Sequence, residues 1–352
     1  MINKEEIYTI IKAGTQAPSG SNSQPWKFRV KDNVVEVIAL PEKDHPILNF
    51  KNRGTYIAHG ALLENIQIAA NYFGYEMNYQ IFPEKDLSFK ITLKENKSLK
   101  DEDGLYEAIF KRSTNRKHFS LNQLKKEEKE FLFKEVSKFN QCEFIYIEDK
   151  DKIQEIAKEL AWDTYLNLSN KELHKLMFNE IIWSLKEEKD REGRGLFVKT
   201  MELKPQEEKA FKLLKNWTIA SLFKKLGILK NIYKSIFQMY SSCGLFGFIA
   251  VNNKDEDFIY AGKLMENIWL RATKLGLGLH LATGIPFLWQ GINFGDLKIF
   301  SDEEKELINN IYSKVKNISG FKKEVLALNF RLGYSEQPSA KSFKTEPDIQ
   351  FI

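Results

Sequence analysis

The feature that most constrains the fold is an internal repeat at an offset of 202 residues. Residues 60–74 align with residues 262–276, and seven of the fifteen positions are identical. In each copy apolar residues recur at every fourth position, the spacing of one helix face. Each copy ends in a glycine (Gly74, Gly276) suited to a left-handed helix cap. Unrelated amphipathic helices can share this spacing, but the matched Glu-Asn pair and bounding glycines favour a duplication.

Strand-like runs, rich in β-branched and aromatic residues, flank both copies. They are 26–30, 34–40 and 77–82 in the first half, and 245–251, 279–281 and 324–332 in the second. A turn near Asp32-Asn33 joins the first two runs. Each half is therefore predicted to be helices packed on a small sheet, an α+β unit. We place the seam in the Lys-, Glu- and Asn-rich stretch 94–100 and expect two fused half-repeats, residues 1–100 and 101–352.

The second half contains an additional block at about 179–242. It opens with the charged run 186–190, and between 217 and 237 apolar residues fall at helical spacing with lysines between them. A basic amphipathic helix can lie on a membrane surface, but it more often buries its apolar face within its own protein. We expect helices that cover a pocket. Binding to a membrane or a partner protein is the open alternative.

Charge and cysteine content exclude several classes of protein. Of 53 basic residues only eight are arginine, and the net charge is +5, without the clustered basic bias of nucleic-acid-binding modules. Cys142 and Cys243 cannot form a disulfide framework or a cysteine-rich metal site. Neither a signal peptide nor an apolar run of about 18 residues is present. We expect a cytoplasmic protein without a resident metal.

The motifs of several catalytic classes are missing from the sequence. There is no G-x-x-x-x-G-K-[ST] loop, no H-E-x-x-H and no G-x-S-x-G. The five histidines are scattered without ligand spacing, which favours structural or surface roles. We therefore expect no catalytic side chain of these kinds.

Two stretches have the composition of binding loops. Residues 17–28, Ala-Pro-Ser-Gly-Ser-Asn-Ser-Gln-Pro-Trp-Lys-Phe, follow a predicted helix at 4–13 and lead into a strand. Their small residues let a ligand approach the backbone, and Ser and Asn supply hydrogen-bond donors and acceptors. A plain polar loop is the alternative.

The second stretch, residues 106–120, contains Arg112 and Arg116 with hydroxyl and amide groups between them. Arginine presents a fork of donors that matches phosphate oxygens. Ser120, with Gln123 three residues on, predicts a new helix. A cation, a hydroxyl and a helix start together suit a bound phosphate, and a basic surface turn is the alternative.

Both stretches resemble motifs of the FMN-dependent nitroreductase family. Ala-Pro-Ser-x-x-Asn-x-Gln-Pro-Trp-x-Phe at 17–28 is similar to the signature loop of that family, and Lys-Arg-Ser-Thr-Asn-Arg-x-x-Phe at 111–119 resembles its phosphate-binding motif. The Arg-x-x-x-Arg spacing, the order of the two motifs and the helix at 60–65 between them resemble the tandem, Acg-like branch. The last strand and basic tail of the family resemble residues 328–341, and its loop over the flavin resembles residues 275–284.

The resemblance implies an intramolecular pseudo-dimer with one FMN site. Ordinary members are homodimers that bind FMN at the interface, and here the signature loop lies in the first half and the other pieces in the second. The implied FMN contacts are Arg112, Ser113, Asn115 and Arg116 for phosphate and ribityl chain, Lys341 and Lys344 from the tail, Pro18, Ser19 and Asn22 at the ring, and backbone N–H groups near Thr283 and Gly284 facing flavin N5. The family tail carries an arginine shortly after its lysine, where this chain has Phe343 and Lys344.

The function implied is NADH- or NADPH-dependent reduction of nitroaromatic or quinone-like acceptors by ping-pong hydride transfer through FMN. The cofactor would carry the chemistry. A protein that stores FMN in a site closed by the 179–242 block is the alternative. The expected partner is a small-molecule acceptor, with no nucleic acid and no membrane, and a homodimer beyond the pseudo-dimer is compatible with the sequence.

Overall fold

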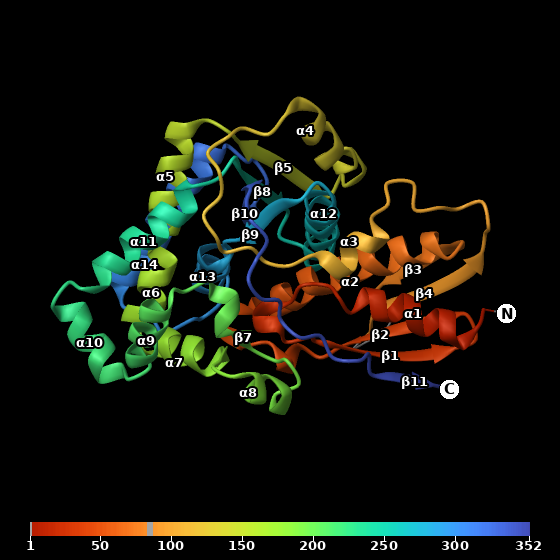
Figure 1. The fold of residues 1–352 in the computed structure, drawn as a ribbon, viewed down its shortest axis with the longest axis horizontal. Coiled ribbons are helices and arrows are strands. Elements are labelled where there is room, and N and C mark those ends of the chain that lie inside the picture. Colours follow the sequence, from red (N-terminus) through yellow and green to blue (C-terminus); the bar gives the residue numbers. More distant parts are fainter. Residues whose placement is uncertain (1, 83–86) are drawn as a thin grey trace.

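Two sheets, each with a long helix against it, occupy the right and centre of the molecule in Figure 1, and a layer of helices occupies the left. This computed structural model describes residues 2–82 and 87–352. The first sheet has the order β11-β1-β2-β4-β3 and the second β5-β8-β10-β9. The strands of the first are β1 (Trp26–Lys31), β2 (Val34–Ala39), β3 (Tyr75–Ile81), β4 (Leu87–Glu95) and β11 (Ile349–Phe351). Those of the second are β5 (Cys142–Ile147), β8 (Leu245–Val251), β9 (Leu277–Leu281) and β10 (Val325–Tyr334).

The two sheets share one topology. In each, a strand (β2 or β8) leads into the repeat helix, the next strand (β3 or β9) follows that helix, and a third strand (β4 or β10) lies antiparallel between them. The outer strands β1 and β5 pair antiparallel with β2 and β8. Four strands of each sheet thus lie in the same order, although the sequence predicted only three in each half and missed β4 and β5. Strand β11 is the exception, since it pairs parallel with β1 from the other end of the chain.

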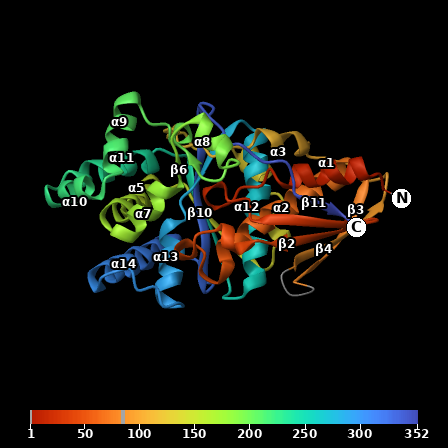
Figure 2. The same ribbon diagram turned by 90° about the horizontal axis from the view of Figure 1, so that it is seen from below.

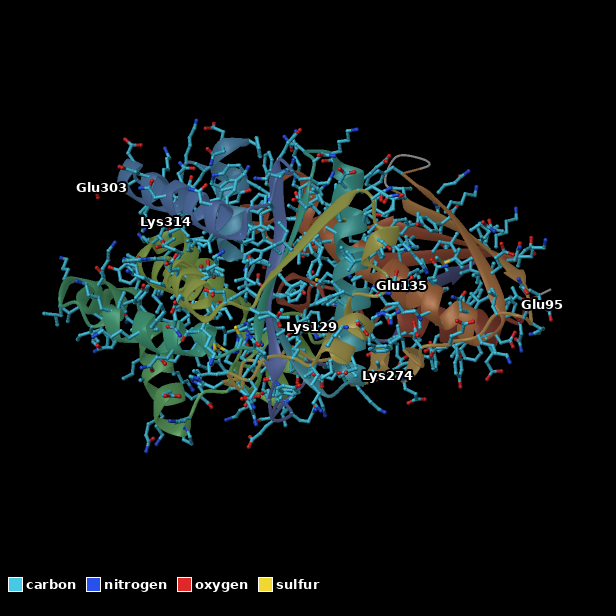
Figure 3. The ribbon with its side chains drawn as sticks, turned by 90° about the horizontal axis from the view of Figure 1, so that it is seen from above. Glu95, Lys129, Glu135, Lys274, Glu303 and Lys314 are labelled. Atoms are coloured by element: carbon cyan, nitrogen blue, oxygen red, sulfur yellow. The ribbon has the colours of Figure 1, made fainter. Side chains whose placement is uncertain are left out.

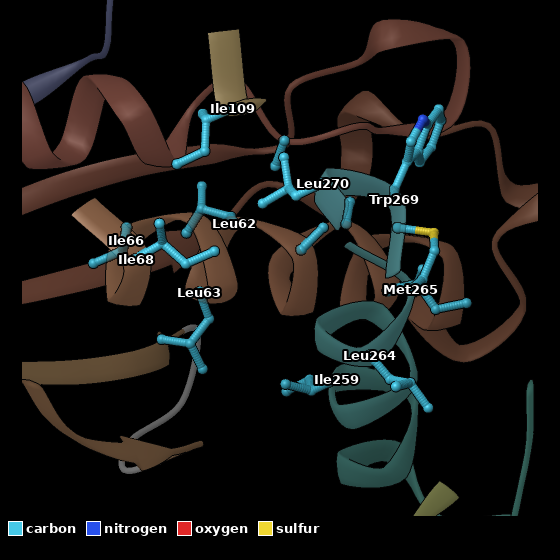
Figure 4. Close-up of a cluster of buried hydrophobic side chains, with 14 of the residues drawn as sticks. Leu62, Leu63, Ile66, Ile68, Ile109, Ile259, Leu264, Met265, Trp269 and Leu270 are labelled. Carbon is cyan, nitrogen blue, oxygen red and sulfur yellow. The ribbon is translucent and has the colours of Figure 1, made fainter. Parts of the chain in front are cut away.

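The repeat helices are α2 (Arg53–Tyr72) and α12 (Asp255–Lys274), which have 20 residues each and start 202 positions apart. They pack directly on each other, and Figure 4 shows their apolar side chains in one cluster. The contact is reciprocal. A Cβ on Gly60 would lie 2.0 Å from the carbonyl oxygen of Ile259, and one on Gly262 would lie 2.0 Å from that of Ile57. Only glycine allows these backbones to approach so closely.

Polar residues of the repeat meet across the same crossing. The Asn267 amide donates to Glu64 Oε1 (2.9 Å), and Glu266 faces Asn65. In both contacts the glutamate of one copy meets the asparagine of the other. Such a reciprocal exchange between two copies is the pattern of a two-fold axis. The caps also match, because Gly74 (φ 76°) and Gly276 (φ 73°) both adopt the predicted left-handed conformation.

Seven helices form a layer between β5 and β8, at the position of the short β1–β2 turn in the first sheet. They are α5 (Lys150–Leu160), α6 (Trp162–Ser169), α7 (Lys171–Glu180), α8 (Leu185–Asp190), α9 (Pro205–Leu214), α10 (Trp217–Lys225) and α11 (Leu229–Ser241). The short strands β6 (Ile181–Ile182) and β7 (Leu196–Phe197) pair within the layer. The layer therefore starts at Lys150, earlier than the predicted block at 179, because α11 packs against α5 and α6.

The remaining helices complete both halves. They are α1 (Lys4–Gly14), α3 (Tyr106–Lys111), α4 (Lys126–Leu132), α13 (Gly284–Asn293) and α14 (Asp302–Ser319). Local chemistry sets several of their ends: the Asn3 side chain caps α1, and Ser301 with Glu304 forms a capping box on α14. Figure 3 shows Glu303 and Lys314 on α14 at the opposite end of the molecule from Glu95.

The helix predicted at Ser120 is wrong. The backbone N–H of Ser120 donates to the Tyr334 carbonyl (2.8 Å), and that of Phe119 donates to the Ser242 carbonyl (3.2 Å). The segment therefore runs beside the end of β10 in extended form. Helix α4 begins only at Lys126, so no helix start adjoins the arginine motif.

One hydrophobic core joins the two halves. It contains Phe28 and Ile91 of the first sheet, Leu62 of α2, and Leu270 and Phe330 of the second half, all buried. The view from below shows α12 lying between the two sheets (Figure 2). Within residues 2–82 and 87–352, no helix is long and apolar enough to cross a bilayer.

Candidate functional site

A cavity of about 400 Å³ lies where three predicted motifs meet. It is lined by Pro18 and Ser19 of the first loop, Arg116 of the arginine motif, and Thr283 and Gly284 at the start of α13. These positions come from both halves of the chain. A volume of this size lies within the range of small-molecule sites, about 300–1,000 Å³.

The loop after α1 is held in a strained conformation. Ser21, Asn22 and Gln24 all have positive φ (44°, 56° and 50°), which is uncommon outside glycine. The Asn22 amide donates to the carbonyls of Gly193 (2.7 Å) and Phe343 (2.8 Å), which tie the loop to the helical layer and the C-terminal tail. Asn22 is not among the residues that line the cavity, and its two hydrogen bonds position this loop.

Arg112 anchors a buried charge cluster beside the cavity. Its Nε lies 3.1 Å from Glu266 Oε1, and both side chains are buried. Its guanidinium also donates to the Gln16 carbonyl (2.6 Å) and stacks over the Trp269 ring at 4.6 Å. Burial raises the pKa of Glu266 to about 7 although Arg112 opposes the shift, so its negative charge is incomplete at neutral pH.

Two tail lysines join this cluster. Lys341 donates to the Phe110 carbonyl and Lys344 to the Ala17 carbonyl, each at 2.6 Å. Removal of the amine from water, with Arg112 nearby, lowers the pKa of Lys341 to about 8. The same two causes hold the pKa of Lys344 well below its ordinary value. Three basic groups thus lie around one carboxyl group, and a bound anion would favour their charged forms.

The rest of the arginine motif has divided roles. Arg116 lines the cavity and donates to the Thr200 carbonyl (3.0 Å); burial lowers its pKa to about 10. Asn115 is buried and its amide donates to the Glu336 carbonyl (2.8 Å), which fastens the tail. Thr114 lines the cavity, although it is not among the FMN contacts that the family resemblance implies. Ser113 beside it is partly exposed.

Asp163 of α6 is a cavity residue that the sequence did not indicate. A Cβ on Gly284 would lie 2.0 Å from Asp163 Oδ1, so this carboxyl rests against the backbone at the start of α13. Oδ1 is buried and has no hydrogen-bond partner within the described residues. Burial raises the pKa of Asp163 to about 6. No sequence signal marks it, because it lies in an ordinary amphipathic helix.

Other ionisable groups line the same cavity. His280 accepts a hydrogen bond from Arg331 Nε (3.2 Å), and burial holds its pKa well below 6.5, so the ring is neutral. Burial raises the pKa of Tyr240 above its ordinary value, and also those of Asp44 and Glu180. Over the ranges 2–82 and 87–352, no cluster of His, Cys, Asp and Glu could hold a metal ion.

Comparisons with known proteins give only distant similarity. No family model and no curated protein matches the sequence. A nitroreductase with bound FMN from Bacteroides fragilis is 11% identical, over 69% of this chain and 94% of its own, with a TM-score of 0.33. The FMN-dependent nitroreductase NfnB from Mycobacterium smegmatis, in complex with NADPH, is 11% identical over 66% of this chain and 89% of its own, with a TM-score of 0.36. An FMN-dependent nitroreductase from Clostridium difficile is 13% identical over 68% of this chain and 95% of its own, with a TM-score of 0.33. These scores are too low to assign the chain to a family.

Proposed function

We propose that this protein binds FMN and uses NADH or NADPH to reduce nitroaromatic or quinone-like acceptors. The observation that carries the proposal is the meeting of three motifs, distant in sequence, at one cavity beside a cluster of three basic side chains and one carboxyl group. The motifs are the ones that resemble those of FMN-dependent nitroreductases.

The residues present fit a phosphate-bearing cofactor. Arg112, Lys341 and Lys344 would hold the phosphate, since three basic groups lie here against the single carboxyl group of Glu266. Arginine and lysine are the usual partners of phosphate oxygens. Pro18, Ser19, Thr283 and Gly284 would line the ring, with Arg116 near the ribityl chain.

When bound, FMN supplies two-electron transfer between a nicotinamide donor and an acceptor. The protein would hold donor and acceptor in turn in the same cavity. Reduction of a quinone to a hydroquinone consumes two electrons and two protons. Asp163, protonated in part near neutral pH, would deliver one of these protons from its carboxyl group and regain it from water.

We also propose that the two halves form an intramolecular pseudo-dimer, as in the tandem branch, with residues 1–100 and 101–352 as its halves. Shared sheet topology and the reciprocal contacts of Gly60 and Gly262 support this. The helical layer would then be an insertion into the second half.

A flavin-storage protein is the second candidate. The cavity lies at the small end of the range for ligand sites, and Leu176, Met177 and Glu180 of α7 line it. FMN alone would fill much of this space. Storage predicts tight FMN binding without reduction by either nicotinamide.

One experiment separates the two candidates. The purified protein is denatured, the released flavin is identified by chromatography, and the intact protein is mixed with NADH or NADPH in a stopped-flow spectrometer. Bleaching of the flavin band, followed by recovery when a quinone or nitroaromatic is added, supports the reductase. Bound FMN that neither nicotinamide bleaches supports storage, and failure to bind added FMN overturns both.

A further inference from the structure

The surface of helices α9–α11 exposes an unusual number of leucines. Leu213, Leu222 and Leu226 are 60%, 51% and 64% exposed. Leu222 and Leu226 stand one turn apart, so they share a face at the end of α10. The sequence predicted that the apolar residues between 217 and 237 are buried in the protein, and for Leu222 and Leu226 that prediction is wrong.

Beyond the first turn of α9, which carries Glu207 and Glu208, the same stretch of chain is rich in lysine and lacks acidic residues. Acidic residues make up about one residue in seven of the whole chain, but none occurs from 209 to 254. Residues 209–241 carry seven exposed lysines: Lys209, Lys212, Lys215, Lys224, Lys225, Lys230 and Lys234. We call these lysines and the three leucines the lysine–leucine face. Abundant lysine alone does not produce it, because the acidic residues that accompany lysine elsewhere are missing.

The opposite side of α10 packs on the rest of the helical layer. Ala220 of α10 is buried, Trp217 packs against His174 with ring centres 5.1 Å apart, and Lys224 donates to the Ser169 carbonyl (3.1 Å). Figures 1 and 2 both place α10 at the extremity of the molecule farthest from the first sheet. The leucines therefore project from a supported helix at one tip, where a flat surface can reach them.

We propose that the lysine–leucine face binds the surface of an anionic lipid bilayer. Helices that lie in the lipid interface show leucines flanked by lysines, and α10 and α11 show this pattern without an acidic residue. Apolar side chains enter the headgroup boundary while the ammonium groups meet lipid phosphates. An acidic protein would satisfy the lysines but leave the exposed leucines without a reason. The binding mode is peripheral and does not depend on the proposed flavin chemistry.

The test is co-sedimentation of the full chain with vesicles. Vesicles of one-third phosphatidylglycerol in phosphatidylcholine should pellet the protein at low salt, and pure phosphatidylcholine should not. Binding should fall at least tenfold between 50 and 500 mM salt, because the lysines act through screened charge. The variants Leu222→Glu/Leu226→Glu and Lys225→Glu/Lys230→Glu should each lose binding at least tenfold.

Matched controls keep the result interpretable. Leu121→Glu changes a leucine of similar exposure (57%) away from the helical layer, and Lys27→Glu/Lys94→Glu reverses two exposed lysines of the first sheet. Both should bind vesicles as the unaltered protein does. Circular dichroism melting shows that each variant is folded. Equal pelleting with neutral vesicles, or loss of binding in the controls, overturns the proposal. So does a dimer by light scattering that Leu222→Glu/Leu226→Glu converts to a monomer without any vesicle binding.

Discussion

At the scale of single residues, the chemical centre of the molecule is the buried pair of Arg112 and Glu266, with Lys341 and Lys344 of the tail beside it. Each basic side chain already donates to a backbone carbonyl, and the proximity of Arg112 lowers the pKa of both lysines. Such an arrangement lowers the stability of the empty protein and prepares it for an anion.

Replacing Lys344 by methionine should separate stability from binding. The variant removes a desolvated amine but takes away the hydrogen bond to the Ala17 carbonyl, so we expect a net gain of about 1 kcal/mol in unfolding free energy. The affinity for FMN should fall at least tenfold. Calorimetry and fluorescence titration measure the two quantities. Lys94→Met, at an exposed position, should change neither, and lower stability with unchanged affinity would contradict the assignment.

Lys341 should make FMN binding depend on pH. Its pKa of about 8 in the empty protein should rise when a phosphate lies beside it. Binding then takes up a proton above pH 8, and the Kd should rise by up to about tenfold per pH unit between pH 8 and 9.5. Titrations at several pH values measure this. Lys341→Arg stays charged throughout, so its Kd should remain flat, and an equal rise in that variant would exclude Lys341 as the cause.

Asp163 should make stability depend on pH. Because burial raises its pKa to about 6 from the ordinary 3.8, the folded state binds a proton more tightly than the unfolded state between these values. Stability therefore falls as pH rises from 4 to 6 and then levels. Asp163→Asn removes this loss, so the variant should be more stable above pH 6, on the order of 2 kcal/mol. Thermal unfolding at pH 4.5 and 7 measures it. The control Asp151→Asn, at an exposed position, should change the unfolding free energy by the same amount at both pH values.

At the scale of elements, the crossing of α2 and α12 decides the architecture. Both helices were predictable, with their glycine caps, because amphipathic spacing and the duplicated sequence act locally. Their mutual packing was not, since the role of Gly60 and Gly262 depends on a backbone 202 positions away. The error at Ser120 has the same origin, because pairing with Tyr334 overrides a local cap signal.

Gly262→Ala should force the two helices apart. The added methyl would meet the Ile57 carbonyl at 2.0 Å, and a backbone atom cannot turn away as a side chain can. We expect a loss of about 3 kcal/mol in unfolding free energy, after the gain in helix propensity. Gly60→Ala should lose a similar amount, because its contact is the reciprocal one. Gly20→Ala, whose nearest neighbour would be 3.7 Å away, is the control, and chemical denaturation measures all three.

At the scale of the whole molecule, the halves share one core and one candidate site. The sequence could predict which loops carry binding chemistry, since their composition is local. It could not predict that Asp163 rests on Gly284 or that Leu222 stays exposed, because both follow from how the helical layer sits against the sheets.

Separate expression should show that the halves depend on each other. Residues 1–100 and 101–352 made alone should lack a cooperative thermal transition, because buried residues of both build the core around α2 and α12. Mixed or co-expressed pieces should regain it, together with FMN binding. Calorimetry of each piece measures this, and a sharp transition in either one alone would show that the halves are independent domains.

The pairing of β11 with β1 affects how the chain folds while it is being synthesised. Phe28 of β1 is paired with Ile349 of β11, so an edge made early in translation meets its neighbour only after 321 further positions have been added. Until then β1 is an open edge on the ribosome, a surface on which nascent chains can associate wrongly. The tail that covers it also carries Lys341 and Lys344. Protection of the edge and completion of the phosphate cluster therefore arrive together, and an incomplete chain has neither.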